Sequence, residues 1–334
     1  MKSITIFNNK GGVGKTTFLC NLASYISLQM HKRVLVIDAD PQCNATSYLI
    51  PETALLSFYE TGGRETIASF LDPLRRGKGY RANPVQVENS KRFGVDLIPG
   101  DPRLALSEDL LAQDWVHGSA GDPRGLQTTF VFQDMMLRYS EYDYIFLDVG
   151  PSLGAINRAV LIGSNYFVVP MSSDIFSLMA IKNISLSLIE WRRLLVKGLE
   201  EYKNKESSDY TIGGSVTNWQ LKFAGYVIQQ YTAKVSEGQR RPVGAYERIL
   251  RRVPGVINSE LVTKFYLNIS LQYKLGEIPN LHSIVPMSQT ANAPIFALKA
   301  KDGVVGAHFA KVNEAEEIYR KIAERLMVNL EAVQ

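Results

Sequence analysis

The sequence predicts an α/β protein with a doubly wound, mostly parallel sheet flanked by helices. Two observations lead to this fold class. Short apolar runs without polar alternation recur along the 334-residue chain, which is typical of strands that are buried on both faces of a parallel sheet. Segments with helical spacing of apolar residues separate these runs, and strands that alternate with helices indicate repeated βαβ units.

The first βαβ unit is the clearest. Residues 3–7 and 34–37 are apolar runs, and between them a glycine-rich loop precedes helical spacing over residues 17–30. Further strands are expected at 95–98, 144–147, 166–169, 223–228 and 282–285, and further helices at 103–115, 126–139, 175–199 and 304–330. We expect one domain over residues 1–334, with surface additions near 51–83 and 202–218, where glycine, charged and polar residues gather.

Composition excludes several classes of protein. With 46% hydrophobic and 21% charged residues, the chain is typical of a globular protein, and its net charge of +4 permits anionic partners without requiring them. Two cysteines and four scattered histidines provide no disulfide framework, cysteine-rich zinc site or iron–sulfur cluster. No apolar run approaches the roughly 20 residues that span a bilayer. Because a strand-like run begins within two residues of Met1, we expect no signal peptide and a cytoplasmic location.

The glycine-rich loop carries the most specific signal. It reads NKGGVGKTT over residues 9–17. A loop between a strand and a helix N-terminus binds phosphate through backbone N–H groups and the helix dipole, and glycine lets the backbone approach closely. We expect Lys15 to reach the β- and γ-phosphates and the Thr16 hydroxyl to ligate Mg²⁺. The ordinary pattern has glycine at position 9, whereas this chain has Asn9 and an additional lysine, Lys10.

Carboxylates follow two of the expected strands. Asp38 and Asp40 lie in IDADPQ over residues 37–42, and Asp148 lies in IFLDVGP over residues 145–151. Open α/β sheets bind ligands at the carboxyl ends of their strands, and a hydrophobic strand that ends in Asp is typical of a Walker B element. These segments, together with the loop, predict a site for a nucleotide and Mg²⁺.

With these three segments the chain resembles the ParA family of deviant Walker P-loop ATPases, which belongs to the ParA/MinD superfamily. Within the family it resembles the members that lack an N-terminal helix-turn-helix. The resemblance implies ATP and Mg²⁺ as cofactors and an ATP-dependent homodimer in which Lys10 reaches the partner's phosphates. It also implies that Asp40 orients or activates the attacking water, and that Asp38 and Asp148 support Mg²⁺. The loop residues that it implies at the nucleotide are Lys10, Gly11, Gly12, Val13, Gly14, Lys15, Thr16 and Thr17.

Contacts with the base are expected from position alone. Gln230, at the end of the run 228–231, and Pro286, at the end of the expected strand 282–285, would lie near the base, although both could equally be plain strand ends. ATP is favoured over GTP because the chain lacks an Asn-Lys-x-Asp element that would recognise guanine.

A basic segment predicts a DNA-binding face. Basic residues outnumber acidic ones between residues 182 and 274, and Arg248, Arg251 and Arg252 share one face if residues 245–253 form a helix. Such a face would bind DNA phosphates without sequence preference and with strong salt dependence. The alternative is an ordinary solvated helix. ParA members of this type usually carry arginines after an Ile-Pro-like step, and residues 285–290 have none, so the cargo could be something other than DNA.

The resemblance therefore implies a slow, partner- or DNA-stimulated ATPase. As a dimeric switch it would segregate or position plasmid or chromosomal DNA, or another cargo, with a ParB-like adaptor, and it would associate with the nucleoid if it binds DNA. The alternatives are a MinD-like or protein-complex-positioning ATPase without DNA binding and a small-molecule ligase of the same superfamily. A C-terminal apolar stripe predicts a docked helix rather than a membrane anchor, so no membrane partner is expected; it comprises Ile318, Ile322, Leu326 and Leu330.

Overall fold

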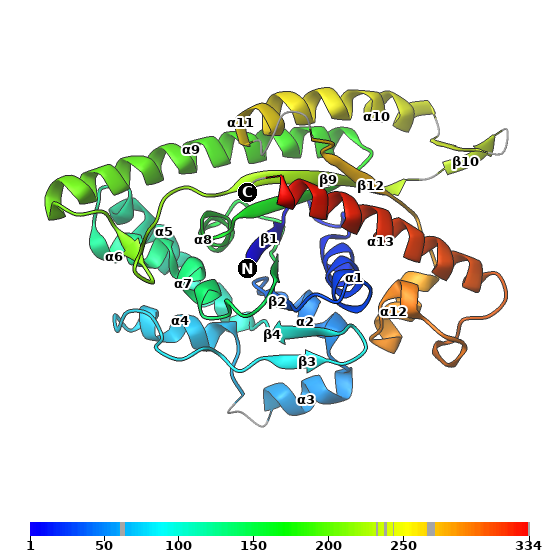
Figure 1. The fold of residues 1–334 in the computed structure, drawn as a ribbon, viewed down its shortest axis with the longest axis horizontal. Coiled ribbons are helices and arrows are strands. Elements are labelled where there is room, and N and C mark those ends of the chain that lie inside the picture. The colour runs from blue at the N-terminus through cyan, green and yellow to red at the C-terminus, as the bar shows by residue number, and fades with distance from the viewer. Residues whose placement is uncertain (61–63, 232, 237–238, 243, 266–270, 333–334) are drawn as a thin grey trace.

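The computed structural model describes residues 1–334 except 61–63, 232, 237–238, 243, 266–270 and 333–334 (Figure 1). At its centre is an eight-stranded sheet, and its strands are β1 (Lys2–Ile6), β2 (Val34–Asp38), β3 (Glu88–Ser90), β4 (Val95–Ile98), β5 (Tyr144–Asp148), β6 (Tyr166–Ser172), β9 (Lys222–Tyr231) and β12 (Lys274–Pro279). Their spatial order is β12-β9-β6-β1-β5-β2-β4-β3, and every neighbouring pair is parallel except β3 with β4. This arrangement confirms the expected fold class.

The path of the chain brings β1 and β5 together at the middle of the sheet. From β1 the chain passes through α1 (Lys15–Leu28) to β2 on one side, and from β5 it passes through α8 (Ala155–Gly163) to β6 on the other side. The carboxyl ends of β1 and β5 therefore lie where successive connections diverge. In open α/β sheets this switch point is where ligands bind.

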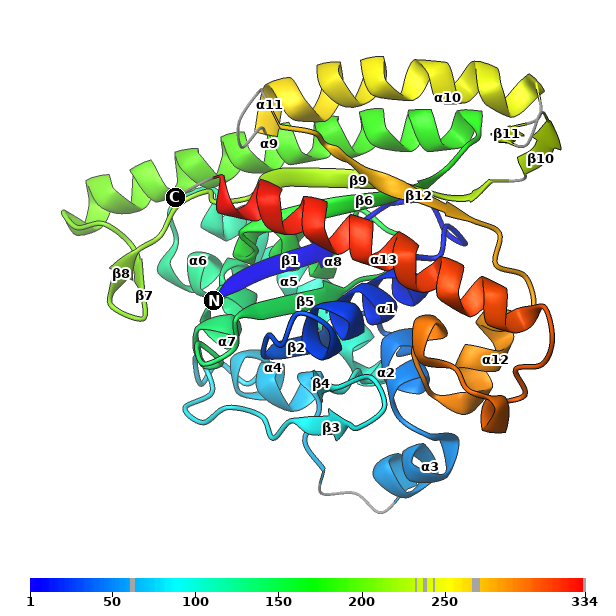
Figure 2. The ribbon, with the colours of Figure 1, turned by 45° about the vertical axis from the view of Figure 1, so that its right-hand side comes forward.

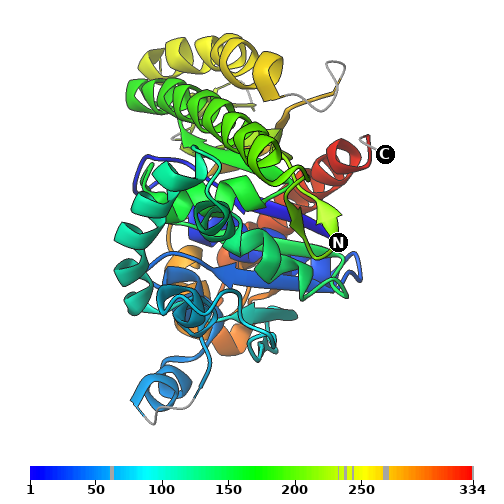
Figure 3. The same cartoon turned by 90° about the vertical axis from the view of Figure 1, so that its left-hand side faces the viewer.

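Helices cover both faces of the sheet (Figure 2). One face is covered by α1, α12 (Ile284–Ala291) and α13 (His308–Glu331). The other is covered by α5 (Glu108–Gly118), α6 (Pro123–Thr129), α7 (Val131–Leu137), α8, α9 (Ile175–Glu206), α10 (Gly244–Ile257) and α11 (Thr263–Phe265). Figure 3 shows α10, in yellow, lying along α9, in green, at one edge of the molecule.

The buried strands explain why the sequence lacks polar alternation. In β2, Leu35 and Ile37 belong to the apolar core on one face, whereas Val34 and Val36 belong to the core on the other face. All five residues of β2 are buried. Since successive side chains of a strand point to opposite faces, a sheet that is covered twice requires apolar residues at every position.

One expected strand is wrong. Residues 282–285 do not form a strand, because Ile284 begins α12 and the last parallel strand is β12 (Lys274–Pro279). Ile284 and Ser288 are both buried, which is the spacing of one helix face. A four-residue apolar run is too short to distinguish the two periods, and Gly276 and Glu277 interrupt the apolar pattern of the true strand. In addition, the expected helix over 126–139 is divided at Phe130 into α6 and α7.

Segments outside the sheet adopt short elements. Residues 51–83 contain α3 (Glu52–Glu60) and α4 (Ile67–Arg75), and α2 (Asn44–Leu49) precedes them. Residues 202–218 contain the end of α9 and the ribbon of β7 (Thr211–Ile212) and β8 (Ser215–Val216), while β10 (Ala233–Ser236) and β11 (Gln239–Pro242) form a second ribbon. The C-terminal stripe is docked as expected, since Ile322, Leu326 and Leu330 of α13 are buried in the core. Among the described residues, no helix is long and apolar enough to cross a membrane.

Candidate nucleotide-binding site

The glycine-rich loop leads directly from β1 into α1. Gly12 and Gly14 have φ angles of 69° and 74°, a left-handed conformation that glycine adopts without steric cost. Asn8 holds the start of the loop, because its side-chain amide donates to the carbonyl of Pro170 at 2.8 Å and its side-chain oxygen accepts from the backbone N–H of Lys10 at 2.9 Å. Hydrogen bonds of Asn8 within the protein thus fix the backbone at the start of the loop.

The N-terminus of α1 is open to an anion. Gly14 is its N-cap, no side chain caps the helix, and no acidic residue lies in its first turn. A cavity of about 200 Å³ lies in front of it, and its lining consists of Gly11, Gly12, Val13, Gly14, Lys15, Thr16, Thr17, Asp40, Gln42, Asn44 and Pro151. Free N–H groups and the positive end of the helix dipole favour phosphate at this position.

Lys15 is buried at the N-terminus of α1. Its ammonium group lies 3.4 Å from the carbonyl oxygen of Lys10, at the far side of the loop. Burial lowers the pKa of Lys15, and the carboxylates of Asp148 and Asp40 partly oppose this effect. The Lys15 ammonium group therefore lies near the carboxylates of Asp148 and Asp40, and a phosphate group in the cavity would be a further anionic partner for it.

Asp148 and Thr16 are brought together. The Thr16 hydroxyl donates to Asp148 Oδ2 at 2.7 Å, whereas Asp148 Oδ1 is buried and has no hydrogen-bond partner among the described residues. Desolvation raises the pKa of Asp148 to about 8, and the neighbouring Asp38 carboxylate adds to the shift. A buried oxygen without a partner costs free energy unless a ligand or water satisfies it.

These oxygens fit Mg²⁺. The ion prefers carboxylate, hydroxyl and water ligands and is usually held by one or two carboxylates together with phosphates of the substrate. Among the described residues, no group of three or more His, Cys, Asp or Glu side chains could hold a metal ion by itself. A bound ion would therefore depend on Thr16, Asp148, water and nucleotide phosphates.

Asp38 lies beside Asp148 but is engaged by the protein. The two residues are register partners on β2 and β5. Asp38 Oδ2 accepts from the backbone N–H and the hydroxyl of Thr46 at 2.8 and 2.6 Å, and Oδ1 accepts from the Asp40 N–H at 3.3 Å. Burial raises the pKa of Asp38 to about 6, against the effect of these hydrogen bonds. Asp38 thus links β2 to α2.

Asp40 lines the phosphate cavity. Its Oδ1 accepts from the backbone N–H of Gln42 at 2.9 Å, and its side chain is largely buried. A side chain on Gly150 would approach Asp40 Oδ1 to 3.3 Å, so the glycine leaves room for this carboxylate. Asp40 is thus one of the residues that line the cavity in front of α1.

Lys10 is turned away from its own phosphate cavity. Its ammonium group forms an ion pair with Asp174 and lies 3.0 Å from the Ser172 hydroxyl, at the junction of β6 and α9. It does not line the cavity in front of α1.

Of the two expected base contacts, Pro286 does not line the cavity in front of α1, and the side chain of Gln230 lies outside the described part of the structure. Pro286 lies exposed in the first turn of α12, because the strand expected to precede it is a helix, and Gln230 lies near the end of β9 with its side chain outside the described part of the chain. A second cavity, of about 330 Å³, instead adjoins the loop at Thr16 and Thr17, and its other lining residues are Asn44, Ser47, Tyr48 and Gln289. The helix at 284–291, which the sequence analysis missed, brings Gln289 there; the wrong strand assignment concealed it.

The expected DNA-binding residues lie on one helix. Arg248, Arg251 and Arg252 are exposed on α10, which contains the helix expected over 245–253. Arg251 Nη2 pairs with Glu247 Oε1 at 2.7 Å. α10 lies over α9 at the sheet edge that β12 and β9 form.

Comparisons with known proteins identify the family of the chain. A family model described as an AAA domain (AAA_31) matches residues 1–199. Over 192 residues the chain is 30% identical to the chromosome-partitioning ATPase Soj of Thermus thermophilus, a match that covers 58% of this chain and 63% of that protein. The matched segment thus spans less than two thirds of this relative's length.

Two solved structures resemble most of the chain. Protein DIP2308 from Corynebacterium diphtheriae has a TM-score of 0.72 and 32% identity, with 87% of this chain and 97% of that chain covered. Cyanothece McdA, as a variant in complex with ATP, has a TM-score of 0.63 and 18% identity, with 98% and 96% covered, and so shares the fold. On the family match over residues 1–199 and these likenesses, the chain belongs to the ParA family of P-loop partition ATPases.

Proposed function

We propose that the protein is an ATP-dependent dimeric switch that hydrolyses ATP slowly and positions a cargo. The observation that carries the proposal is the pairing of Thr16 with Asp148 at the open N-terminus of α1. The Thr16 hydroxyl and the Asp148 carboxylate, one oxygen of which has no hydrogen-bond partner among the described residues, lie beside a loop that can bind phosphate. This arrangement suits the Mg²⁺ complex of a nucleoside triphosphate.

The residues of the site have different roles at the phosphates. The backbone of residues 11–14, Lys15 and Thr17 hold the phosphate chain, while Thr16 and Asp148 hold Mg²⁺, with Asp38 supporting the metal side of the cluster. Mg²⁺ supplies neutralisation of the charge that develops on the phosphate oxygens. Asp40 orients the attacking water, and its place in the lining of the phosphate cavity supports this role.

We place the base in the second cavity. It shares Thr16, Thr17 and Asn44 with the phosphate cavity, so a nucleotide can extend from one into the other. Tyr48 and Gln289 provide an aromatic ring and an amide at its wall. This assignment replaces Pro286 as the expected base contact and leaves Gln230 without a described role.

Closure into a dimer is supported by an unusual surface beside Lys10. Directly after Asp174, the first two turns of α9 expose large apolar side chains: Ile175, Phe176 and Met179 are 42%, 67% and 56% exposed. Exposed apolar patches of this kind mark protein–protein contacts. We infer that a second copy of the chain covers them and that Lys10 then turns to the partner's nucleotide.

We infer that the assembled dimer binds DNA. The arginines of α10 would bind its phosphates without sequence preference, and a dimer would present two such faces. The Thermus relative is named a chromosome-partitioning ATPase, which supports segregation or positioning of DNA. We infer that a ParB-like adaptor or a cargo protein stimulates hydrolysis, and that the protein acts in the cytoplasm, on the nucleoid when bound to DNA.

One experiment tests the core of the proposal. The rate of phosphate release and the molar mass by light scattering are measured with ATP and Mg²⁺, with and without DNA. We expect slow turnover, a monomer without nucleotide, and a dimer with a slowly hydrolysed ATP analogue. A protein that binds no ATP, or that binds it without any change in mass, would contradict the switch.

A further inference from the structure

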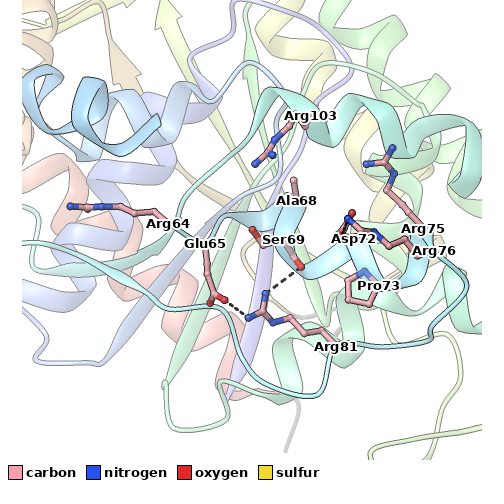
Figure 4. Close-up of a pocket in the computed structure, with 10 residues that line it drawn as sticks. All are labelled: Arg64, Glu65, Ala68, Ser69, Asp72, Pro73, Arg75, Arg76, Arg81 and Arg103. Carbon is pink, nitrogen blue, oxygen red and sulfur yellow. Dashed lines mark hydrogen bonds and ion pairs between the residues drawn. The ribbon is translucent and has the colours of Figure 1, made fainter. Parts of the chain in front are cut away.

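A further polar cleft lies beside α4, a helix that Figure 1 shows at the opposite end of the sheet from α10. It encloses about 520 Å³ beside α4, and none of its residues lines the nucleotide cavities. Figure 4 shows side chains from four segments around a floor of small residues of α4. We call it the arginine cleft, and its lining consists of Arg64, Glu65, Ala68, Ser69, Asp72, Pro73, Arg75, Arg76, Arg81 and Arg103.

The loop after α4 shapes one side of the arginine cleft. Residues 75–81 read RRGKGYR. Gly77 and Gly79 have φ angles of 69° and 76°, so glycine lets the chain reverse sharply there. The reversal places Arg81 across the cleft from Arg75 and Arg76 (Figure 4).

Two arginines of the cleft are held firmly. Arg81 forms an ion pair with Glu65, and its Nε and Nη1 atoms donate to the carbonyls of Asn83 and Ser69 at 2.9 and 3.3 Å. The guanidinium of Arg64 stacks over the ring of Phe58 at 5.3 Å. These contacts fix the positions of two cations before any ligand arrives, which lowers the entropy that a ligand must overcome.

Other arginines keep donors available. Arg75 is exposed and forms no ion pair or side-chain hydrogen bond within the described ranges. Arg103 uses Nε and Nη2 for Asp101, and Arg76 uses Nη2 for Asp72 at 2.9 Å. A guanidinium has five N–H donors, so each of these pairs leaves donors for a further anion.

The charge balance favours an anion. Five arginines line the cleft against two carboxylates, Glu65 and Asp72, and two carboxylates outside the lining, Glu88 and Asp101, pair with Arg64 and Arg103. Arg75 is therefore the one arginine of the cleft that no carboxylate of the described residues neutralises. The pair of Arg76 with Asp72 is solvent-exposed on both sides, and such pairs contribute little and rearrange readily, whereas Arg103 is held by the buried carboxylate of Asp101. Arginine binds phosphate through two parallel hydrogen bonds, a geometry that lysine lacks.

We propose that the arginine cleft binds a small ligand with two or more adjacent phosphate groups. The concave shape fits a compact ligand, since sites for small molecules enclose about 300–1,000 Å³. The lining contains no aromatic side chain on which a base could stack, so recognition rests on phosphates alone. Because the cleft and the nucleotide site share no lining residue, this proposal stands independently of the proposed function.

Calorimetric titration of the full chain with inorganic tripolyphosphate tests the proposal. We expect binding that weakens about tenfold in Arg75→Gln, because a hydrogen bond to a charged group contributes about 1.5–3 kcal/mol and about 1.4 kcal/mol is tenfold in affinity. Arg75 has no ion-pair or hydrogen-bond partner among the described residues whose loss could disturb folding, so this single variant remains informative if larger ones fail to fold. In the Lys15→Ala background, which removes phosphate binding at the nucleotide loop, the triple variant Arg64→Gln/Arg75→Gln/Arg103→Gln should lose tripolyphosphate binding altogether.

Two controls locate the ligand. The charge-matched triple variant Arg248→Gln/Arg251→Gln/Arg252→Gln and the loop variant Lys15→Ala should both keep tripolyphosphate binding at the cleft. Loss of all binding in Lys15→Ala would place the anion at the nucleotide loop and overturn the proposal. Equal losses in the two arginine triple variants would show a non-specific charge effect and overturn it as well.

A competition experiment separates a small ligand from nucleic acid. Duplex DNA should not displace tripolyphosphate from the wild-type protein, and the cleft triple variant should bind DNA normally. If DNA displaces the anion, and only the cleft variant loses DNA binding, the cleft is part of a nucleic-acid surface and the proposal is wrong.

Discussion

The ammonium group of Lys10 forms an ion pair with the carboxylate of Asp174, the residue that caps the N-terminus of α9. The Ser172 hydroxyl lies within hydrogen-bond distance of both groups, at 3.0 and 2.8 Å. Burial alone would raise the pKa of Asp174, but hydrogen bonds from Lys10 and Ser172 hold it below its ordinary value. A lysine that is proposed to act across a dimer is thus held within its own subunit, and dimerisation must break this pair.

The first prediction concerns Asp174→Asn. Asparagine can still cap α9, because its side-chain oxygen can accept from the Ser177 N–H as Asp174 does, at 3.0 Å. The variant therefore loses the ion pair and keeps the helix. We expect it to dimerise at a lower concentration of a slowly hydrolysed ATP analogue than the wild type, as measured by light scattering.

Lys10→Ala is the matched control. It breaks the same ion pair but also removes the group that would act in trans, so we expect normal ATP binding without dimerisation or hydrolysis. A normal dimer in Lys10→Ala would exclude the trans role. An unchanged dimerisation threshold in Asp174→Asn would show that the pair does not restrain Lys10.

Lys15 and Pro286 illustrate which features of the candidate site could be predicted from the sequence and which could not. Lys15 belongs to a loop whose chemistry depends on local backbone shape, so spacing alone predicts where its side chain points. The expected position of Pro286 depended on which segment pairs with β9, and a buried run of four residues does not determine that pairing. The pair of Lys10 with Asp174 likewise joins residues that are 164 positions apart in the chain, and no local pattern encodes such a contact.

The second prediction concerns Lys15→Ala. Removal of the buried ammonium leaves the triphosphate without its point-charge partner, so ATP binding should fall below detection, a loss on the order of a hundredfold or more. Calorimetry with ATP and Mg²⁺ measures it. Lys32→Ala, which changes an exposed lysine outside the loop, serves as the control and should bind ATP normally. Unchanged affinity in Lys15→Ala would contradict the assignment of the loop.

The third prediction concerns Asp40→Ala. The variant should bind ATP and Mg²⁺ and accumulate as a dimer, while hydrolysis slows by about 10²–10⁴, the usual cost of losing a group that handles a proton or water. Single-turnover phosphate release measures the chemical step. Asp109→Ala, at an exposed position of α5, provides the control with the same charge change. Turnover at the wild-type rate in Asp40→Ala would reduce this carboxylate to a turn residue.

The fourth prediction concerns pH. The folded protein holds the protons of Asp38 and Asp148 more tightly than the unfolded chain, with pKa values of about 6 and about 8 against about 3.9 for unperturbed Asp. Their contribution to stability is present in full below about pH 4 and is lost as the pH rises through these values. The metal-free protein should therefore melt at a lower temperature at about pH 8 than at about pH 5.

Calorimetric melting across this range, with and without Mg²⁺, provides the measurement. Asp148→Asn removes one of the two titrating groups and should show a smaller decline, while Mg²⁺ should stabilise the wild type more at the higher pH because both carboxylates are ionised there. A melting temperature that rises steadily between about pH 5 and pH 8 in the metal-free wild type, with the same slope in the variant, would show that the cluster does not titrate in this way.

The last prediction concerns DNA. Replacing Arg248, Arg251 and Arg252 by glutamate reverses the charge of the exposed face of α10 without touching the nucleotide loop or the carboxylate cluster. The ATP-bound wild-type dimer should bind unrelated duplexes about equally well. Its affinity should fall more steeply with salt than that of the monomer, since log affinity falls by about 0.9 per neutralised phosphate for each unit of log salt and the dimer doubles the contacts. The variant should lose DNA binding and keep ATP-driven dimerisation, as measured by fluorescence anisotropy of a labelled duplex and by light scattering.

Absence of binding by the wild-type dimer at low salt would favour positioning of a cargo without DNA. Binding that survives in the variant would move the site to another basic surface, with Arg192, Arg193 and Lys197 of α9 the next residues to change.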